Sequence, residues 1–234
     1  MIETREFYDN EFGVVKVKYN VRARRIIFRV KDGCLNITIP PLSTLDFVKE
    51  RLAENRERIR KLFNRNPINT LSVGTTIDTC CFKIAIHSHS RDKLLFAFKD
   101  SQLNIFVPSA IKIEEAEFQK FLKSKILHLS KRIVLPFFKK RIDELAVING
   151  LKYNKLSVST GRSRLGVCNV KKEIKLSVYL MFYPQHLIDY VIMHELAHLT
   201  EMNHSPRFHS LCNAYCGGRE RELERELKKF IFPL

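Results

Sequence analysis

Short stretches in the first half of the chain alternate apolar with polar residues, a pattern that predicts half-buried β-strands. Two of them, 28–40 and 96–108, repeat each other at a constant offset of 68 residues, with seven of thirteen positions identical. Each has a turn sequence at its centre, Lys-Asp-Gly in the first and Lys-Asp-Ser in the second, and each ends at a proline. Both copies are therefore predicted to be β-hairpins.

A strand before each hairpin and a helix after it complete the predicted repeat unit. The strands are expected at 14–19 and 82–87, and the helices at 44–63 and from residue 113 into the 130s. One unit alone buries little apolar surface, so the two are expected to form a small α+β layer together.

The second half of the chain changes to mainly helical periodicity. Its first helical stretch contains Pro136, which should kink or split the helix, and Asn149-Gly150 should end it. The later elements are expected to be a strand at 153–160, a hairpin formed by 167–170 and 173–178, and helices at 185–203, 206–216 and 219–230.

This order of elements predicts an α+β protein. A β-rich N-terminal region with the two hairpin–helix repeats is expected at 1–112, and a second domain at 113–234.

The helix expected at 185–203 contains the strongest candidates for chemistry. His194 and His198 are four residues apart, so an α-helix places both imidazoles on one face, where they can bind one metal ion. Glu195 points about 100° around the helix, so it is expected to act as a general base for zinc-bound water rather than as a ligand. This H-E-x-x-H arrangement predicts a zinc-dependent hydrolase.

A catalytic zinc ion usually has three protein ligands and keeps a fourth position for water. His204 is the first candidate for the third ligand, because it follows Asn203, a natural helix terminator, and the chain can fold back under the metal there. His209 is the second candidate and Glu201 the third, and spacing alone leaves the choice open.

The formal net charge of +16 predicts attraction to polyanions such as nucleic acid or nucleotides. Two helical stretches contribute to it: 49–65 has seven Lys or Arg against three Glu, and 120–141 has eight and no acid. A polyanion-binding surface and an ordinary solvated helix face are both open interpretations of these stretches.

No apolar run approaches the roughly 20 residues that a membrane span needs, and residues 1–6 are polar, without the apolar core of a signal peptide. Six cysteines show no regular spacing and are expected to be free thiols. We therefore expect a cytoplasmic protein without membrane contact.

The segment 154–230 resembles the YgjP-like metallopeptidase domain family, which is related to the SprT and minigluzincin zinc peptidases. The motifs that carry the resemblance are Arg164-Leu165-Gly166-Val167-Cys168, the run 189–199 around the two histidines, and Asn203-His204-Ser205-Pro206-Arg207-Phe208. The stretch 24–41 is similar to this family as well. Two motifs depart from it: R-L-G-V-C stands where R-W-G-S-C is usual, and Phe-His at 208–209 where Phe-Trp is usual.

The resemblance implies that 113–234 is a small zincin-like helical metallopeptidase domain. It implies zinc as the cofactor, held by His194, His198 and His204, with Glu195 as the catalytic base. A peptide or protein is then the expected substrate. Further candidates for contact with the substrate or the transition state are Arg164 and Tyr190.

Two other functions compete with the peptidase. The net charge would suit a nucleotide triphosphate pyrophosphatase, an activity that the resemblance also implies, but the chain has no G-x-x-x-x-G-K-[ST] loop and no carboxylate cluster for magnesium. The third hypothesis is a nucleic-acid-associated protein with a structural zinc, and His209 would be the fourth ligand of that zinc ion.

Overall fold

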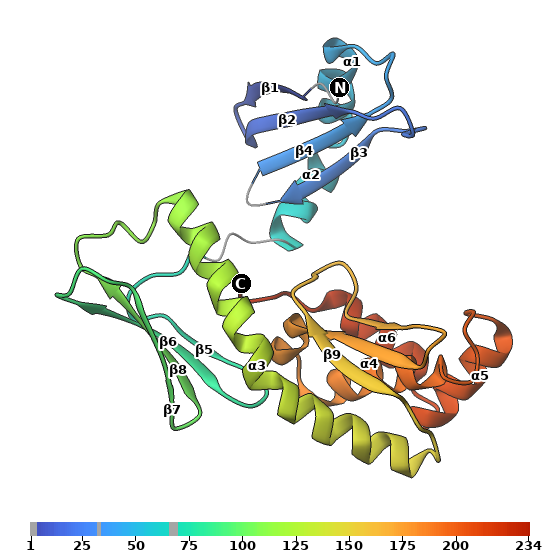
Figure 1. Ribbon diagram of the computed structural model, residues 1–234. Coiled ribbons are helices and arrows are strands. Elements are labelled where there is room, and N and C mark those ends of the chain that lie inside the picture. Colours follow the sequence, from blue (N-terminus) through green and yellow to red (C-terminus); the bar gives the residue numbers. More distant parts are fainter. Residues whose placement is uncertain (1–3, 32–33, 66–69) are drawn as a thin grey trace. The chain divides into compact units, whose positions relative to one another are not determined.

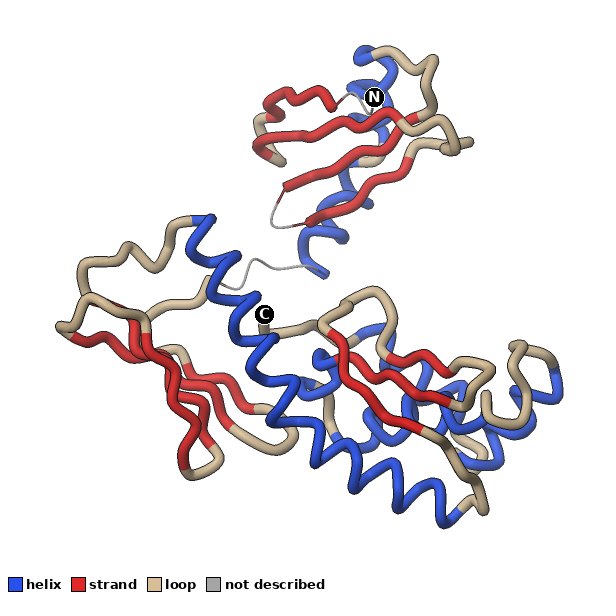
Figure 2. Tube along the Cα trace, in the orientation of Figure 1, coloured by secondary structure: helices blue, strands red, loops and turns tan. Residues whose placement is uncertain are grey.

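The computed structural model of the protein describes residues 4–31, 34–65 and 70–234. Helices and strands alternate along these ranges, which confirms the α+β class (Figure 2). The chain divides into two compact units, Met1–Asn69 and Thr70–Leu234. The first holds one sheet and two helices, and the second holds two sheets and the long helix α3 (Figure 1).

The first unit is a four-stranded sheet covered on one face by helices. Its elements are β1 (Thr4–Asp9), β2 (Gly13–Tyr19), β3 (Ile27–Lys31), β4 (Cys34–Ile39), α1 (Leu45–Glu54) and α2 (Arg56–Arg65). The strand order is β1-β2-β4-β3, in which only the central pair β2 and β4 is parallel. Alternate residues of the central strands are fully buried, together with apolar residues of the helices: Val15, Val17, Leu35, Ile37, Ile39, Val48 and Ile59.

The single helix expected at 44–63 is two helices that meet at Asn55. Thr44 begins α1 as its N-cap, with its hydroxyl accepting from the amide of Phe47 at 3.2 Å. Asn55 ends it, because its side-chain amide donates to the Arg51 carbonyl at 2.8 Å. A polar side chain that bonds the backbone in this way competes with continuation of the helix.

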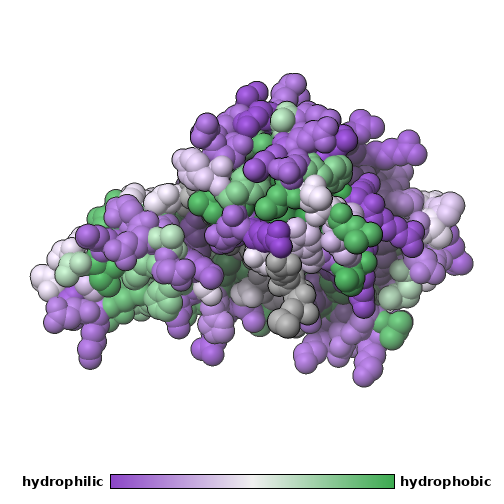
Figure 3. Space-filling model, turned by 90° about the horizontal axis from the view of Figure 1, so that it is seen from above, coloured by the Kyte–Doolittle hydropathy of each residue, from purple (hydrophilic) through white to green (hydrophobic). Residues whose placement is uncertain are grey.

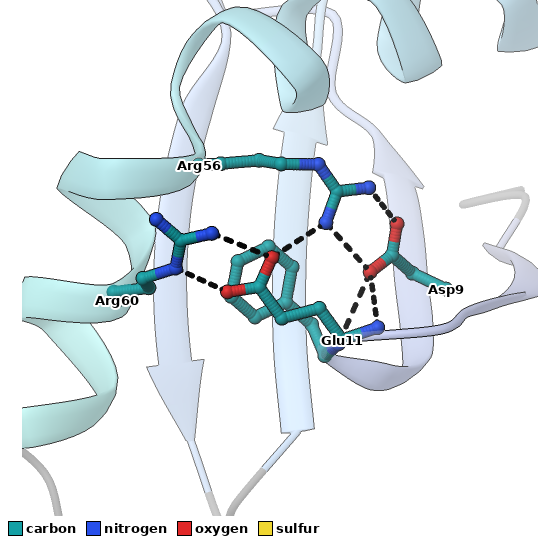
Figure 4. A network of polar contacts seen from close by, with 5 residues as sticks. Asp9, Glu11, Arg56 and Arg60 are labelled. Atoms are coloured by element: carbon teal, nitrogen blue, oxygen red, sulfur yellow. Dashed lines mark hydrogen bonds and ion pairs between the residues drawn. The ribbon is translucent and has the colours of Figure 1, made fainter.

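Four charged side chains fasten α2 to the turn between β1 and β2 (Figure 4). Arg56 donates to Asp9 at 2.8 Å and to Glu11 at 2.7 Å, and Arg60 donates to the same Glu11 carboxylate. The basic side of this helix is therefore partly neutralised within its own unit.

The second sheet repeats the topology of the first, which confirms the repeat expected from the sequence. Its strands are β5 (Thr76–Asp78), β6 (Lys83–His89), β7 (Leu95–Lys99) and β8 (Gln102–Pro108), in the order β5-β6-β8-β7. The hairpin registers agree at the offset of 68, since Ile27 pairs with Thr38 and Leu95 with Phe106. The strands β1 and β5 were not predicted, because their apolar alternation is weak or short.

The turn residues are described in the second hairpin but not in the first. In the second copy, Asp100 and Ser101 both have positive φ, 49° and 56°, as a two-residue type I′ turn requires. In the first copy the expected turn residues, Asp32 and Gly33, lie outside the described residues.

Of the two outcomes expected at Pro136, a kink or a split, the split does not occur, because helix α3 (Ala116–Ile148) runs through the proline without a break. The proline is exposed. The carbonyl that loses its helical partner four residues earlier, at Arg132, is on the same exposed side and can bond water instead.

The remaining elements form a three-stranded sheet followed by short helices. They are β9 (Lys155–Ser159), β10 (Gly166–Cys168), β11 (Glu173–Ser177), a 3-10 helix (Val178–Phe182), α4 (Gln185–Ala197), α5 (Pro206–Tyr215) and α6 (Glu220–Lys229). The sheet order is β10-β11-β9, with the antiparallel hairpin β10–β11 at one edge and β9 parallel to β11.

One continuous core joins the second sheet, α3 and the helices that follow. It includes Leu103 of β8, Leu122 of α3 and Leu187 of α4, all almost completely buried. The boundary expected between 112 and 113 falls inside the second unit, in which the second sheet and α3 share one core. Within the described residues, no helix is both long and apolar enough to cross a membrane.

Candidate metal centre

Helix α4 is held rigidly on its apolar side. Its buried residues follow the helical period: Leu187, Ile188, Val191, Ile192 and Leu196. A bidentate ion pair adds to this packing, since Arg141 of α3 donates to both carboxylate oxygens of Asp189 at 2.6 and 2.7 Å. These contacts fix the position of α4, and so of the histidines near its C-terminal end.

Three histidines bring ligand atoms to one point. In His194, His198 and His204 the candidate nitrogen atoms all lie within 4.8 Å of one another, and no other group of three His, Cys, Asp or Glu in the described part of the chain does so. The Nε2 atoms of His194 and His204 are 3.1 Å apart. Tetrahedral zinc with bonds of about 2.1 Å needs ligand nitrogens roughly 3.4 Å apart, close to this spacing.

The end of α4 shapes the second half of this cluster. The helix stops at Ala197 instead of residue 203, and His198 is its C-cap. The Nδ1 atom of His198 lies 3.1 Å from the carbonyl oxygen of Glu201. A carbonyl only accepts, so Nδ1–H is the donor and Nε2 is left free to bind a metal.

The start of α5 positions His204 and the floor of the cluster. Ser205 is the N-cap of α5, and its hydroxyl accepts from the amide of Phe208 at 3.2 Å. Phe208 is completely buried, and its ring centroid is 4.9, 4.4 and 4.7 Å from those of His194, His198 and His204. The Phe208 ring therefore packs against all three imidazoles.

The surroundings of His194 and His198 favour the neutral form of both imidazoles. Burial lowers the pKa of His194 to about 4, and repulsion from His198 and His204 acts in the same direction. Burial also lowers the pKa of His198. Metal ions bind the neutral form of histidine, so the donor set fits a transition metal such as zinc near neutral pH.

Glu195 is buried next to this cluster, with 4% of its surface exposed. Burial raises the pKa of its carboxyl to about 8, although the backbone N–H of Cys168 donates to it and acts in the opposite direction. Its Oε2 atom is buried and has no hydrogen-bond partner among the described residues. A buried oxygen of this kind requires a partner, and a water molecule or a cation would fit that role.

Strand β10 passes so close to Glu195 that only glycine fits at residue 166. A Cβ atom placed on Gly166 would lie 2.6 Å from Cγ and 2.7 Å from Cδ of Glu195, and nearer still to Oε1. No role was predicted for Gly166 from the sequence. The signal was present, because this glycine belongs to the motif at 164–168 that carried part of the resemblance.

The other candidate residues lie outside the histidine cluster. His209 contacts Glu220 instead, with Nδ1 and Oε1 2.7 Å apart, and Glu201 contributes only its carbonyl group. Arg164 is exposed in the loop before β10 and makes no hydrogen bond or ion pair with described residues. Tyr190 is 4% exposed with its ring 6.2 Å from that of His194, and burial raises its pKa.

Comparison with known proteins shows which family the chain belongs to. A sequence model of the YgjP-like, metallopeptidase domain family matches residues 24–230. The chain belongs to the YgjP-like metallopeptidase domain family. The comparisons with curated proteins and with solved structures found no match. Membership and the three-histidine cluster together indicate a metal-binding hydrolase of the metallopeptidase type.

The close approach at Gly166 leads to a first prediction. Gly166→Ala forces Glu195 or β10 to move and should lower the free energy of unfolding by about 1–3 kcal/mol, as other overpacking substitutions do. The matched control is Gly161→Ala, where the new Cβ would only meet the hydroxyl of Ser159 at 3.8 Å. Urea denaturation of both variants measures the effect, and equal stabilities would contradict the contact.

The buried carboxyl of Glu195 leads to a second prediction, for protein freed of metal with a chelator. Between pH 4.5 and about 8 this group is ionised in the unfolded chain and protonated in the folded one. The free energy of unfolding then falls as the pH rises, by up to about 1.4 kcal/mol per pH unit. The Glu195→Gln variant lacks this loss, so its stability relative to the wild type should increase with pH across the same window.

Thermal or urea unfolding of both proteins at several pH values measures this difference. A difference that stays constant from pH 4.5 to 8 would show that Glu195 is ionised in the folded, metal-free protein.

Proposed function

We propose that the protein is a zinc-dependent metallopeptidase with Glu195 as its general base. The observation that carries this proposal is the buried Oε2 of Glu195, which has no hydrogen-bond partner among the described residues, in the helix that also carries two of the three converging histidines. A carboxylate in this position can exchange a proton with a reacting group, whereas a merely structural carboxylate would have its hydrogen bonds satisfied.

The ligands would be His194, His198 and His204. Three neutral imidazoles are a donor set that zinc accepts, and they leave one position for a reacting group. When bound, zinc supplies a Lewis acid that polarises a carbonyl group and lowers the pKa of water. His209 supports this open arrangement, because Glu220 engages its Nδ1 and it lies outside the group of converging ligand atoms.

Glu195 would accept a proton through Oε2 and deliver it to the leaving nitrogen of the substrate. Burial keeps the pKa of the carboxyl high, which favours holding the proton between these two steps. The Cys168 N–H orients the group, and a bound cation nearby would favour the ionised form that begins the cycle.

Strand β10 supports a peptide as the substrate. It is the edge strand of its sheet, and Leu165 and Asn169 direct their backbone groups toward β11, as the bonds Ser177 N–H to Leu165 O and Asn169 N–H to Glu173 O show. The alternation of an antiparallel ladder then turns the backbone of Gly166 to the unpaired side. An extended peptide can add to such an edge by main-chain hydrogen bonds, beside Glu195.

Metal content tests the ligand set. Elemental mass spectrometry of protein purified without chelator should find about one zinc per chain, and His198→Ala should lose it. His128→Ala, at an exposed histidine of α3 far along the chain, is the matched control and should keep the metal. Retention of zinc in His198→Ala would refute the assignment of this ligand.

Turnover tests the base. Glu195→Gln should keep its zinc and lose at least about 100-fold in hydrolysis of a peptide library followed by mass spectrometry. Release of pyrophosphate from nucleoside triphosphates is measured in parallel with the same proteins. Activity on nucleotides but not peptides, lost in His198→Ala, would establish the nucleotide pyrophosphatase instead.

A further inference from the structure

The positive charge of the first unit is unevenly neutralised. Its helices contain many of its cations, and four of these have acidic partners, of which Arg56 and Arg60 bind Asp9 and Glu11 (Figure 4). Two further pairs lie along the helices, Arg51 with Glu54 and Lys61 with Glu57. The helical stretch 49–65 is thus a weaker polyanion surface than its composition indicates.

The open face of the first sheet is different. The register places Lys16, Asn36 and Arg29 side by side across β2, β4 and β3, on the face opposite the buried Val15 and Leu35. Lys18 lies in the next row of the same face, beside Thr38. Lys18 and Arg29 are exposed and make no ion pair with described residues, whereas Lys16 is 3.2 Å from Glu6.

Three more cations lie at the end of this face. The loop between β2 and β3 carries Arg22, Arg24 and Arg25, all exposed and without ion pairs in the described ranges. It starts at Asn20, whose N–H donates to the carbonyl of Ile39 at 3.0 Å, so it lies at the edge where β2 and β4 both end. We call these six cations the basic sheet face: Lys16, Lys18, Arg22, Arg24, Arg25 and Arg29.

An aromatic side chain shares the same face. Tyr8 pairs with Val14 across β1 and β2, in the row next to Lys16, and 73% of its surface is exposed. A large aromatic ring exposed to this degree on a sheet, with cations beside it, is suited to stacking against a planar group.

The second copy of the repeat shows that this charge is not required by the fold. On the equivalent face of the second sheet, Lys83 lies 3.5 Å from Asp78 and Lys99 lies 4.0 Å from Asp100. His87 takes the place that Lys18 has in the first sheet, and it stacks on Phe106 with ring centroids 5.2 Å apart. The two sheets therefore have the same topology but differ in the unpaired positive charge on this face, which is the property that would attract a polyanion.

We propose that the basic sheet face binds single-stranded nucleic acid. Its cations contact the phosphates, and a base stacks on Tyr8, because a groove or face that combines cations with exposed aromatic rings recognises unpaired bases. Figure 3 shows that hydrophilic side chains cover much of the surface seen from above, with hydrophobic areas between them. The inference does not depend on the proposed peptidase activity.

The experiment measures binding of the full-length protein to a fluorescein-labelled 20-nucleotide single strand of mixed sequence by fluorescence anisotropy. The Lys18→Glu/Arg29→Glu variant should bind at least 10-fold more weakly at low salt. Its plot of log K against log salt should be shallower by about 1.4, since each phosphate contact to a single strand contributes about 0.7.

The matched control is Lys120→Glu/Lys125→Glu, which makes the same change in net charge at two exposed lysines of α3. It should weaken binding by less than about 3-fold. Circular dichroism and thermal unfolding establish that both variants are folded. Equal losses in the two variants, or a larger loss in the α3 variant, would overturn the assignment to the first sheet.

Two further measurements test the kind of partner. Tyr8→Ala should weaken binding to the single strand and leave binding to the corresponding duplex unchanged. Tighter binding of the wild type to the duplex, or to vesicles containing phosphatidylserine, would overturn the choice of single-stranded nucleic acid. Absence of binding at low salt would overturn the proposal as a whole.

Discussion

The burial of Glu195 under strand β10 is the contact on which the rest of the site depends. The carboxyl loses its contact with water, and the Cys168 N–H compensates for only part of that loss. The strand can come this close only because residue 166 is glycine. The folded chain therefore contains an unfavourable interaction that a proton or a nearby cation would relieve, and a metal ion bound there would then stabilise the domain.

The surrounding fold supplies rigidity on both sides of that contact. The pair Arg141–Asp189 and a fully apolar side hold α4 against α3, so His194 and Glu195 are fixed by secondary structure rather than by a loop. His204 comes from the short segment between α4 and α5, and Phe208 beneath it compensates for the lack of helical support. Preorganised ligands lose little conformational entropy when an ion binds.

The spacing of His194 and His198 was readable from the sequence because helix geometry alone relates residues four apart. The hairpin repeat was readable for a similar reason, since alternation and turn residues are local signals. Two other contacts could not be predicted from the sequence: Gly166 with Glu195, and His198 with the carbonyl group of Glu201. Each depends on where the backbone of another segment lies, and the composition does not show this. Charge pairing is equally non-local. The composition of α2 alone is basic, but Asp9 at the end of β1 and Glu11 in the turn after it neutralise Arg56 and Arg60.

The most direct test of the account is anomalous X-ray diffraction from crystals of the zinc-loaded protein, recorded on both sides of the zinc absorption edge. We expect one peak, about 2.1 Å from a nitrogen of each of His194, His198 and His204, with the remaining position open toward Glu195. A peak with His209 as a fourth protein ligand would contradict it, because that closed site is structural. Zinc bound elsewhere, with these three histidines vacant, would contradict it as well.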